Sequence, residues 1–236
     1  MNIGLAVYTF KNNDMTFNIG QMEKALEQAR GKVDLLCFGE SFLQGFDALS
    51  WNTDDDYDIA ISQDGDIMRH LCELTIFFKT DLLFGYFEKE DDLLYSSCAV
   101  IERGKLIHNY RRISKGWKVI SKADEHYREG AETRDFFYRG MTCNIALCGD
   151  LWDFPERFKT DGLLLWPIYV NFSLEEWQNY EQEYADQAYL AARRTFMFNS
   201  LSDEPLAHGG AFDFNNGRIA EQFPYDKEGL LIASVL

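Results

Sequence analysis

Residues 142–156 read TCNIALCGDLWDFPE, and they restrict the fold more than any other stretch. The apolar run ends at Cys148, Gly149 permits a sharp turn, and Asp153–Glu156 carry the early proline and the acid that are typical of a helix start. The pattern predicts a strand, a turn and a helix, with the thiol at the carboxyl end of the strand, where open α/β sheets bind ligands. The backbone N–H after such a thiol can donate to an oxyanion, and a helix N-terminus stabilises a thiolate. Cys148 is therefore either a nucleophile or a small buried core residue.

Strand and helix patterns alternate on both sides of this stretch. Helical spacing between the early apolar runs predicts parallel strands covered by helices, and hairpin signals at Glu102–Lys105 and Arg139–Gly140 add antiparallel pairs. We expect mixed sheets, and the pattern alone leaves open two packed sheets in four layers or one sheet in three layers. The acidic run Asp54–Asp56 is expected in a solvated loop. Strands are expected at Ile3–Tyr8, Val33–Phe38, Leu82–Phe87, Leu94–Ile101, Leu106–Arg111, Phe136–Tyr138, Thr142–Leu147, Leu163–Ile168, Phe196–Leu201, Ala211–Phe214 and Leu230–Val235, and helices at Phe17–Ala29, Ile67–Phe78 and within Leu174–Arg194.

Composition and charge exclude several functional classes. The chain has 236 residues, of which 46% are hydrophobic and 15% aromatic, so we expect one globular domain over residues 1–236. The net charge of −16 repels nucleic acid and anionic lipid, which argues against partners of either kind. No apolar run approaches the roughly 18 residues of a membrane-spanning helix, and Met1–Tyr8 lack the features of a signal peptide.

The cysteines point to a reducing compartment. Five cysteines without a leader sequence indicate free thiols and a cytoplasmic protein. No CxxC pair occurs, and the histidines do not stand at metal-ligand spacing near any cysteine, so we expect no zinc site. We expect no metal or cofactor of any kind.

Two further segments end an apolar strand with residues that can take part in catalysis. Glu40 follows the run Leu35–Phe38, where burial would raise its pKa into the range of a general base, although an exposed loop acid fits equally well. Asn109–Lys118 end a strand in a basic cluster, which is either an oxyanion site or a solvated turn.

A glutamate, a basic residue and a cysteine that follow successive strands in this order resemble the nitrilase, or carbon–nitrogen hydrolase, superfamily. The resemblance extends over nearly the whole chain, and the cysteine segment is its most specific part. The matching pieces are Asn2–Ala6, Phe38–Glu40, Gly85–Phe87, Tyr95–Ser97, Gly104–Lys105, Tyr110–Arg112, Cys148–Asp150, Phe154–Glu156, Gly210–Phe212 and Asn216–Ile219.

The resemblance implies an α-β-β-α sandwich and a Glu-Lys-Cys triad. Glu40 would be the general base and Cys148 the nucleophile, which would form a thioester with a small amide before water releases the acid. A lysine and the N–H of Gly149 would stabilise the oxyanion. Glu125 best matches a second glutamate that positions the lysine and the substrate. A homodimer formed through the helix at Leu174–Tyr189 is implied in the same way.

Three departures from the family pattern concern the site itself. Arg112 stands where the family has its lysine, so Lys115, Lys118 or Arg112 must supply the cation, and Lys115 is slightly favoured because it is nearer the strand end. Gly149 replaces the usual tyrosine after the nucleophile. Trp152 replaces an arginine, which bears on the preferred charge of the substrate.

The predicted function is hydrolysis of a non-peptide C–N bond in a small amide, with an ω-amide or a carbamoyl compound as substrate and water as the second reactant. Trp152, Trp166 and Tyr169 are candidates to line the substrate pocket. The alternative is an inactive protein of this fold that binds small molecules or serves assembly, which the arginine at the lysine position favours. A Cys-His hydrolase that uses His126 or His208 is a third hypothesis.

Overall fold

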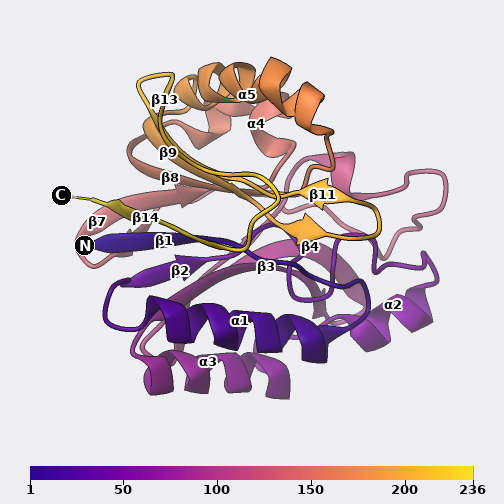
Figure 1. The fold of residues 1–236 in the computed structure, drawn as a ribbon. Coiled ribbons are helices and arrows are strands. Elements are labelled where there is room, and N and C mark those ends of the chain that lie inside the picture. The colour runs from indigo at the N-terminus through magenta and orange to yellow at the C-terminus, as the bar shows by residue number, and fades with distance from the viewer. Residues whose placement is uncertain (236) are drawn as a thin grey trace.

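Two six-stranded sheets pack face to face between helices, and this gives the four-layer α-β-β-α sandwich visible in Figure 1. The computed structural model describes residues 1–235. The prediction of an α-β-β-α sandwich of two mixed sheets is therefore confirmed, and the single three-layer sheet that the strand pattern left open is wrong.

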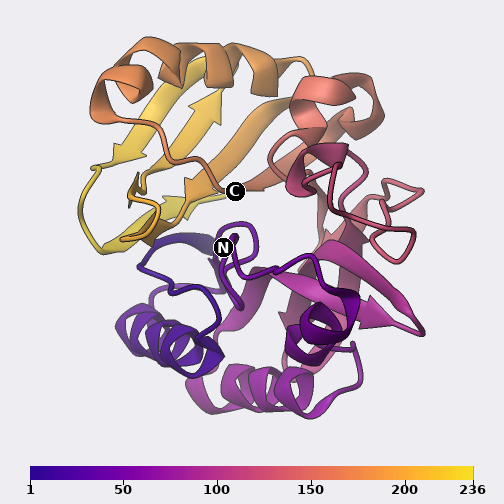
Figure 2. The ribbon, with the colours of Figure 1, turned by 90° about the vertical axis from the view of Figure 1, so that its right-hand side faces the viewer.

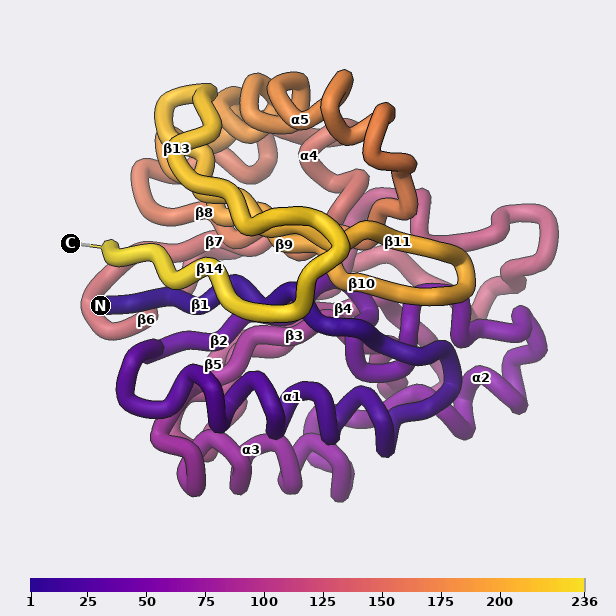
Figure 3. Tube along the Cα trace, in the orientation of Figure 1, coloured from indigo at the N-terminus to yellow at the C-terminus, as the bar shows by residue number. Residues whose placement is uncertain are grey.

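The first sheet has the strand order β14-β1-β2-β3-β4-β5. Its centre is parallel, because β1, β2 and β3 are joined through helices, whereas β14, β4 and β5 pair antiparallel with their neighbours. In Figure 3 the first and last strands of the chain run side by side. The strands are β1 (Asn2–Val7), β2 (Leu35–Cys37), β3 (Asp81–Glu90), β4 (Leu93–Glu102), β5 (Lys105–Arg111) and β14 (Gly229–Ser234).

The second sheet has the order β13-β12-β9-β8-β7-β6. Strands β7, β8 and β9 are parallel, and both edges are antiparallel pairs. The strands are β6 (Phe136–Tyr138), β7 (Met141–Ile145), β8 (Thr160–Ile168), β9 (Ala192–Asn199), β12 (Ala211–Asn215) and β13 (Arg218–Phe223), and a separate small pair consists of β10 (Leu201–Ser202) and β11 (Ala207–His208).

Amphipathic helices form the two outer layers. Helix α1 buries Met22, Leu26 and Ala29, which recur at the spacing of one helix face, and Asp14 caps its first turn by accepting from Phe17 N. Helix α5 begins with a capping box between Ser173 and Glu176. The helices are α1 (Met15–Ala29), α2 (Thr53–Ile59), α3 (Asp66–Phe78), α4 (Asp150–Asp153) and α5 (Leu174–Tyr189), with short 3-10 turns η1 (Lys115–Trp117) and η2 (Pro155–Phe158).

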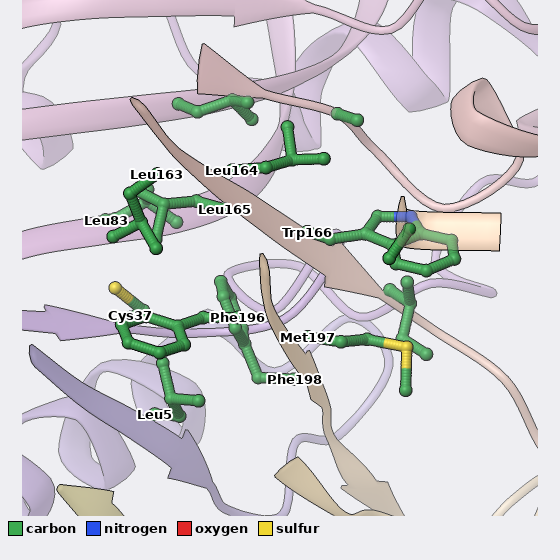
Figure 4. Close-up of a cluster of buried hydrophobic side chains, with 14 of the residues drawn as sticks. Leu5, Cys37, Leu83, Leu163, Leu164, Leu165, Trp166, Phe196, Met197 and Phe198 are labelled. Carbon is green, nitrogen blue, oxygen red and sulfur yellow. The ribbon is translucent and has the colours of Figure 1, made fainter. Parts of the chain in front are cut away.

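The main core lies between the sheets. Figure 4 shows Leu5, Cys37 and Leu83 of the first sheet against Leu165 and Phe196 of the second. All five are fully buried, and each such side chain contributes about 1.5–3 kcal/mol of transfer free energy. The core therefore fixes how the two sheets sit on each other, and with them the strand ends that carry the candidate site.

Three local expectations are corrected. Asp54–Asp56 lie in α2 and not in a loop. Asp54 and Asp55 are exposed as expected, but the Asp56 carboxylate is buried and accepts hydrogen bonds from Ser50 N, Trp51 N and Tyr127 Oη. The helix after the cysteine begins at Asp150, before the expected Asp153. Strand β13 was not expected, because its residues are mostly polar on an exposed sheet edge. Within residues 1–235, no helix is long and apolar enough to cross a membrane.

Candidate active site

The candidate site lies where three strands end. Strands β2 and β5 run in the same direction in the first sheet, so Glu40 and Arg112 both follow carboxyl ends on one side of the molecule. Cys148 follows β7 of the second sheet. The loops that leave these strand ends lie on the side of the sandwich that faces the viewer in Figure 2. The packing of the sheets brings together three residues that are far apart in the sequence.

Glu40 and Arg112 form a buried ion pair. Arg112 Nη1 donates to Glu40 Oε1 at 2.6 Å, and the two side chains are 2% and 0% exposed. Arg112 Nε donates to Ser114 Oγ at 2.8 Å, so the guanidinium is held at two of its nitrogens. A buried charge without a partner would cost several kcal/mol, and each member of the pair therefore fixes the other.

The other carboxylate oxygen of Glu40 is free. Oε2 is buried and has no hydrogen-bond partner among the described residues. Burial raises the pKa of Glu40 above its ordinary value, although Arg112 acts in the opposite direction. The loop that carries Glu40 passes close to the backbone of Gly85 on β3. A Cβ at Gly85 would lie 2.4 Å from the backbone nitrogen of Ser41, so the absence of a side chain there makes room for the loop. The site thus contains a carboxylate with one anchored oxygen and one available oxygen.

Cys148 sits on a tight turn held by the end of β8. Its φ of 41° lies in the left-handed region, which is strained for a residue with a side chain. Its backbone N–H donates to Pro167 O at 3.0 Å, its carbonyl accepts from Trp166 Nε1 at 2.9 Å, and its Sγ lies 3.7 Å from Tyr169 O. Burial, with the nearby Glu40 carboxylate, raises the pKa of the Cys148 thiol to about 12, and Arg112 opposes this. The thiol is therefore protonated at neutral pH and needs a base to become a nucleophile.

Asp150 joins the two loops that carry Arg112 and Cys148. One carboxylate oxygen accepts from the backbone N–H groups of Ile113 (3.2 Å) and Ser114 (2.8 Å). The other accepts from Leu147 N at 2.9 Å and from Tyr110 Oη at 2.6 Å. The side chain is fully buried. A single carboxylate thus fixes the loop after β5 against the turn after β7.

The structure does not bring every predicted site residue to this place. Lys115 is exposed on η1, and Glu125 is exposed on the following loop. Lys118 Nζ donates to Tyr127 O and pairs with Glu129. The cation that meets Glu40 is Arg112, because it directly follows β5, whereas the chain turns outward after Ser114.

The remaining candidates divide by location. The Trp166 indole donates to the Cys148 carbonyl, and Trp152 packs on Trp166 with ring centroids 6.3 Å apart. Tyr169 meets Cys148 Sγ through its backbone oxygen, whereas its side chain packs against Phe10 and Phe46 and is hydrogen-bonded to Ser202. The histidines of the third hypothesis lie elsewhere: the ring of His126 is bonded to Asp124, and that of His208 to Asp226.

From the sequence alone, an acid beside the nucleophile could either orient the loop or cap the helix, and the four hydrogen bonds of Asp150 were not predicted. Sequence reasoning also missed Ser114 and Tyr110, which hold Arg112 and Asp150. Tyr110 stands in the segment that resembles the family, and an acid directly after the Cys-Gly turn was visible. Their joint role was not visible, because three of the four groups that donate to Asp150 lie 36 to 40 residues away in the chain.

Comparison with known proteins places the chain in a family. The fold is shared with a carbon–nitrogen hydrolase from Helicobacter pylori G27 (TM-score 0.81, 19% identity, 99% of this chain and 88% of that one). It is shared with an amidase from Nesterenkonia sp. AN1, in which acrylamide has added to the active-site cysteine (TM-score 0.80, 16% identity, 100% of this chain and 93% of that one). It is shared also with part of a glutamine-dependent NAD+ synthetase from Acinetobacter baumannii (TM-score 0.76, 22% identity, 98% of this chain and 44% of that one). No curated protein sequence matches the chain.

The sequence profile of the carbon–nitrogen hydrolase family matches residues 2–153, which is well over half of the chain and includes all three strand ends of the site. The chain therefore belongs to the carbon–nitrogen hydrolase family.

Proposed function

We propose that this protein hydrolyses the C–N bond of a small amide, with Cys148 as nucleophile, Glu40 as general base and Arg112 as the cation of the site. One observation carries the proposal. The Arg112 guanidinium holds one oxygen of Glu40 at 2.6 Å, and the second oxygen is left free beside a cysteine on a strained turn. Arg112 thereby takes the place that the sequence assigned by preference to Lys115.

The reaction begins at the thiol. Glu40 Oε2 accepts the proton of Cys148, and Sγ forms a bond to the amide carbon, whose carbonyl oxygen becomes an oxyanion. Collapse of this intermediate expels the amine, which takes the proton from Glu40, and leaves a thioester on Cys148. Glu40 then deprotonates water, which attacks the thioester and returns the thiol and a carboxylic acid. Arg112 stays charged throughout, because a guanidinium does not lose its proton in proteins.

Two unpaired donors support the oxyanion step. Among the hydrogen bonds of residues 1–235, none uses the backbone N–H of Gly149 or Arg112 Nη2. The Gly149 N–H directly follows the nucleophile, and Nη2 lies 2.6 Å from where a Cβ on that residue would be. Both donors are thus available close to Cys148. The removal of one such donor typically costs 10²–10³ in kcat.

The aromatic side chains beside the turn support a small substrate with an apolar part. Trp152 is 38% exposed, while Trp166 is buried behind it. An ω-amide or a carbamoyl compound remains our proposed substrate class. The likeness in fold to an amidase and to a glutamine-dependent enzyme is consistent with this class.

The test is ammonia release across a panel of small amides, ω-amides, carbamoyl compounds and nitriles. We expect release from at least one ω-amide or carbamoyl compound, and its loss to background in Cys148→Ala. Cys72→Ala is the matched control, since Cys72 is a half-buried thiol on α3, and it should keep full activity. No release by the folded protein, or undiminished release by Cys148→Ala, would overturn the proposal, and the former result would favour a binding or assembly role.

We also propose that the protein is a cytoplasmic homodimer and that residues 1–236 form one catalytic domain. Helix α5 and the residue after it expose Tyr180, Tyr189 and Leu190, each more than 40% accessible. Apolar side chains of this kind support an interface. Light scattering after size exclusion should give twice the chain mass of 27.4 kDa, and a monomer mass at micromolar concentration would contradict the dimer.

A further inference from the structure

Two glycines from different segments, Gly116 of η1 and Gly149 at the start of α4, face the same atom of Arg112. A Cβ on Gly149 would lie 2.6 Å from Arg112 Nη2, and a Cβ on Gly116 would lie 2.9 Å from it. Real Cβ contacts of this kind stay above 3.0 Å, so each glycine leaves space that the guanidinium fills. At Gly116 no other described residue beyond its chain neighbours comes within 4 Å of that position, and at Gly149 the next atom after Nη2 is Ser114 Oγ, at 3.3 Å.

The backbone does not require glycine at Gly149. Its φ of −62° and ψ of −11° are helical values that any residue adopts. Gly116 likewise has no φ in the left-handed region. The steric demand of the arginine is therefore the reason that the structure gives for both glycines.

Arg112 cannot simply move aside. It is nearly fully buried, and its guanidinium is bonded to Glu40 through Nη1 and to Ser114 through Nε. Because the guanidinium is planar and rigid, displacement of Nη2 by about an ångström tilts Nη1 and Nε away from their partners. A side chain at either glycine would thus disturb the ion pair of the general base.

We propose that Gly116 and Gly149 form a slot for the guanidinium, and that Gly149 is the positioning residue that lets an arginine act as the cation of this site. This inference rests on the proposed function. It gives one steric reason for two departures from the family pattern, the arginine in place of lysine and the glycine in place of tyrosine after the nucleophile. The glycine provides the space that the larger guanidinium occupies. The slot also leaves Nη2, for which the described residues offer no hydrogen-bond partner, directed over Gly149, the residue that follows Cys148.

A double-mutant cycle tests the slot. Gly149→Ala keeps the backbone N–H and changes only the space beside Arg112, so we expect kcat to fall about 100-fold, the effect of a misplacement of about 1 Å. In the Arg112→Lys background, whose slender ammonium leaves the slot empty, the same substitution should cost less than about threefold. Gly20→Ala on α1, where a Cβ meets nothing within 4 Å, is the control and should leave kcat unchanged.

A second readout needs no substrate. The rate at which iodoacetamide alkylates Cys148 is measured as a function of pH, and the alkylated cysteine peptide is quantified by mass spectrometry. In Gly149→Ala the guanidinium moves away from Glu40 and Cys148, so the alkylation midpoint should move to higher pH, and Arg112→Lys/Gly149→Ala should match Arg112→Lys. If no amide released ammonia, the proposed function would fail, but the alkylation assay would still test the slot because it needs no substrate.

An equal effect of Gly149→Ala in both backgrounds, or no effect in either, would overturn the slot. Where Gly149→Ala does not fold, as judged by circular dichroism, Gly116→Ala takes its place in the same cycle. Gly116 is exposed, and a Cβ added there would meet the same atom of Arg112 at 2.9 Å, so the cycle should show the same dependence on Arg112. Additive effects there would overturn the proposal equally.

Discussion

Replacement of Asp150 by asparagine should loosen both loops of the site at once. An amide has one carbonyl oxygen, so it can replace only one of the two carboxylate oxygens, and its NH2 group takes the place of the other. In one orientation the NH2 faces the N–H groups of Ile113 and Ser114, and in the other it faces Leu147 N–H and the hydroxyl of Tyr110. Only the hydroxyl can turn to accept, so at least one buried N–H loses its acceptor in either case.

The cost follows from these contacts. A buried donor without a partner costs about 1–3 kcal/mol, and the remaining bonds lose the strength that the negative charge gives them. We expect the free energy of unfolding to fall by about 2–4 kcal/mol, which for a chain of this size lowers Tm by about 4–16 °C. Because the substitution also shifts the loops that carry Arg112 and Cys148, kcat should fall about 100-fold.

Differential scanning calorimetry and the ammonia assay measure the two effects. Asp153→Asn is the matched control, since Asp153 is exposed on the same short helix, and it should change stability by less than about 0.5 kcal/mol. Tyr110→Phe removes one of the four bonds and should cost about 1 kcal/mol. A Tm of Asp150→Asn within about 1 °C of the wild type would refute the reasoning.

Three further predictions follow from the site and the corrected helix. Burial raises the pKa of Glu40, and only its ionised form accepts a proton. We therefore expect kcat/KM to fall with decreasing pH, with a midpoint above the ordinary glutamate pKa of about 4.3, and a midpoint at or below that value would contradict this role. Trp166→Phe deprives the Cys148 carbonyl of its indole donor and should cost about 1 kcal/mol of stability together with a measurable part of kcat, whereas an unchanged kcat would show that the indole does not position the turn. Asp56→Asn should destabilise the protein by about 2–4 kcal/mol in urea titration, whereas exposed Asp54→Asn should not, and equal effects would argue against the buried role of Asp56.

The strands were predictable because most of them are buried on both faces. Runs such as Leu82–Phe87 and Leu163–Ile168 are apolar without interruption, which is the signature of central strands. The division of these strands between two sheets did not follow from periodicity, since each run fits one sheet as well as two. Only the resemblance to a family separated the two architectures.

The acidic helix α2 escaped prediction for a nonlocal reason. Three consecutive aspartates indicate a solvated loop when the segment is considered alone. Asp56 is nevertheless buried, because Tyr127, 71 residues away, donates to it together with the backbone of the preceding turn. Contacts of this range depend on the packed fold and leave no local trace in the sequence.

The basic residue that pairs with Glu40 shows the same limit. Arg112, Lys115 and Lys118 stand within seven residues, and each is a reasonable partner for a carboxylate. The choice among them depends on where the strand ends and on Glu40, 72 residues earlier. Glu40 and Cys148 were easier to propose as site residues, because each follows an apolar strand at a glycine-containing turn.

The central claim is that Cys148 carries the acyl group of an amide. The most direct measurement is the mass of the protein and of its cysteine peptides after rapid acid quench during turnover of an amide from the panel. The account predicts a mass increase equal to the acyl group on the peptide that contains Cys148, and its absence in Cys148→Ala. Turnover without an adduct on any cysteine peptide, or an adduct on a peptide without Cys148, would contradict the account.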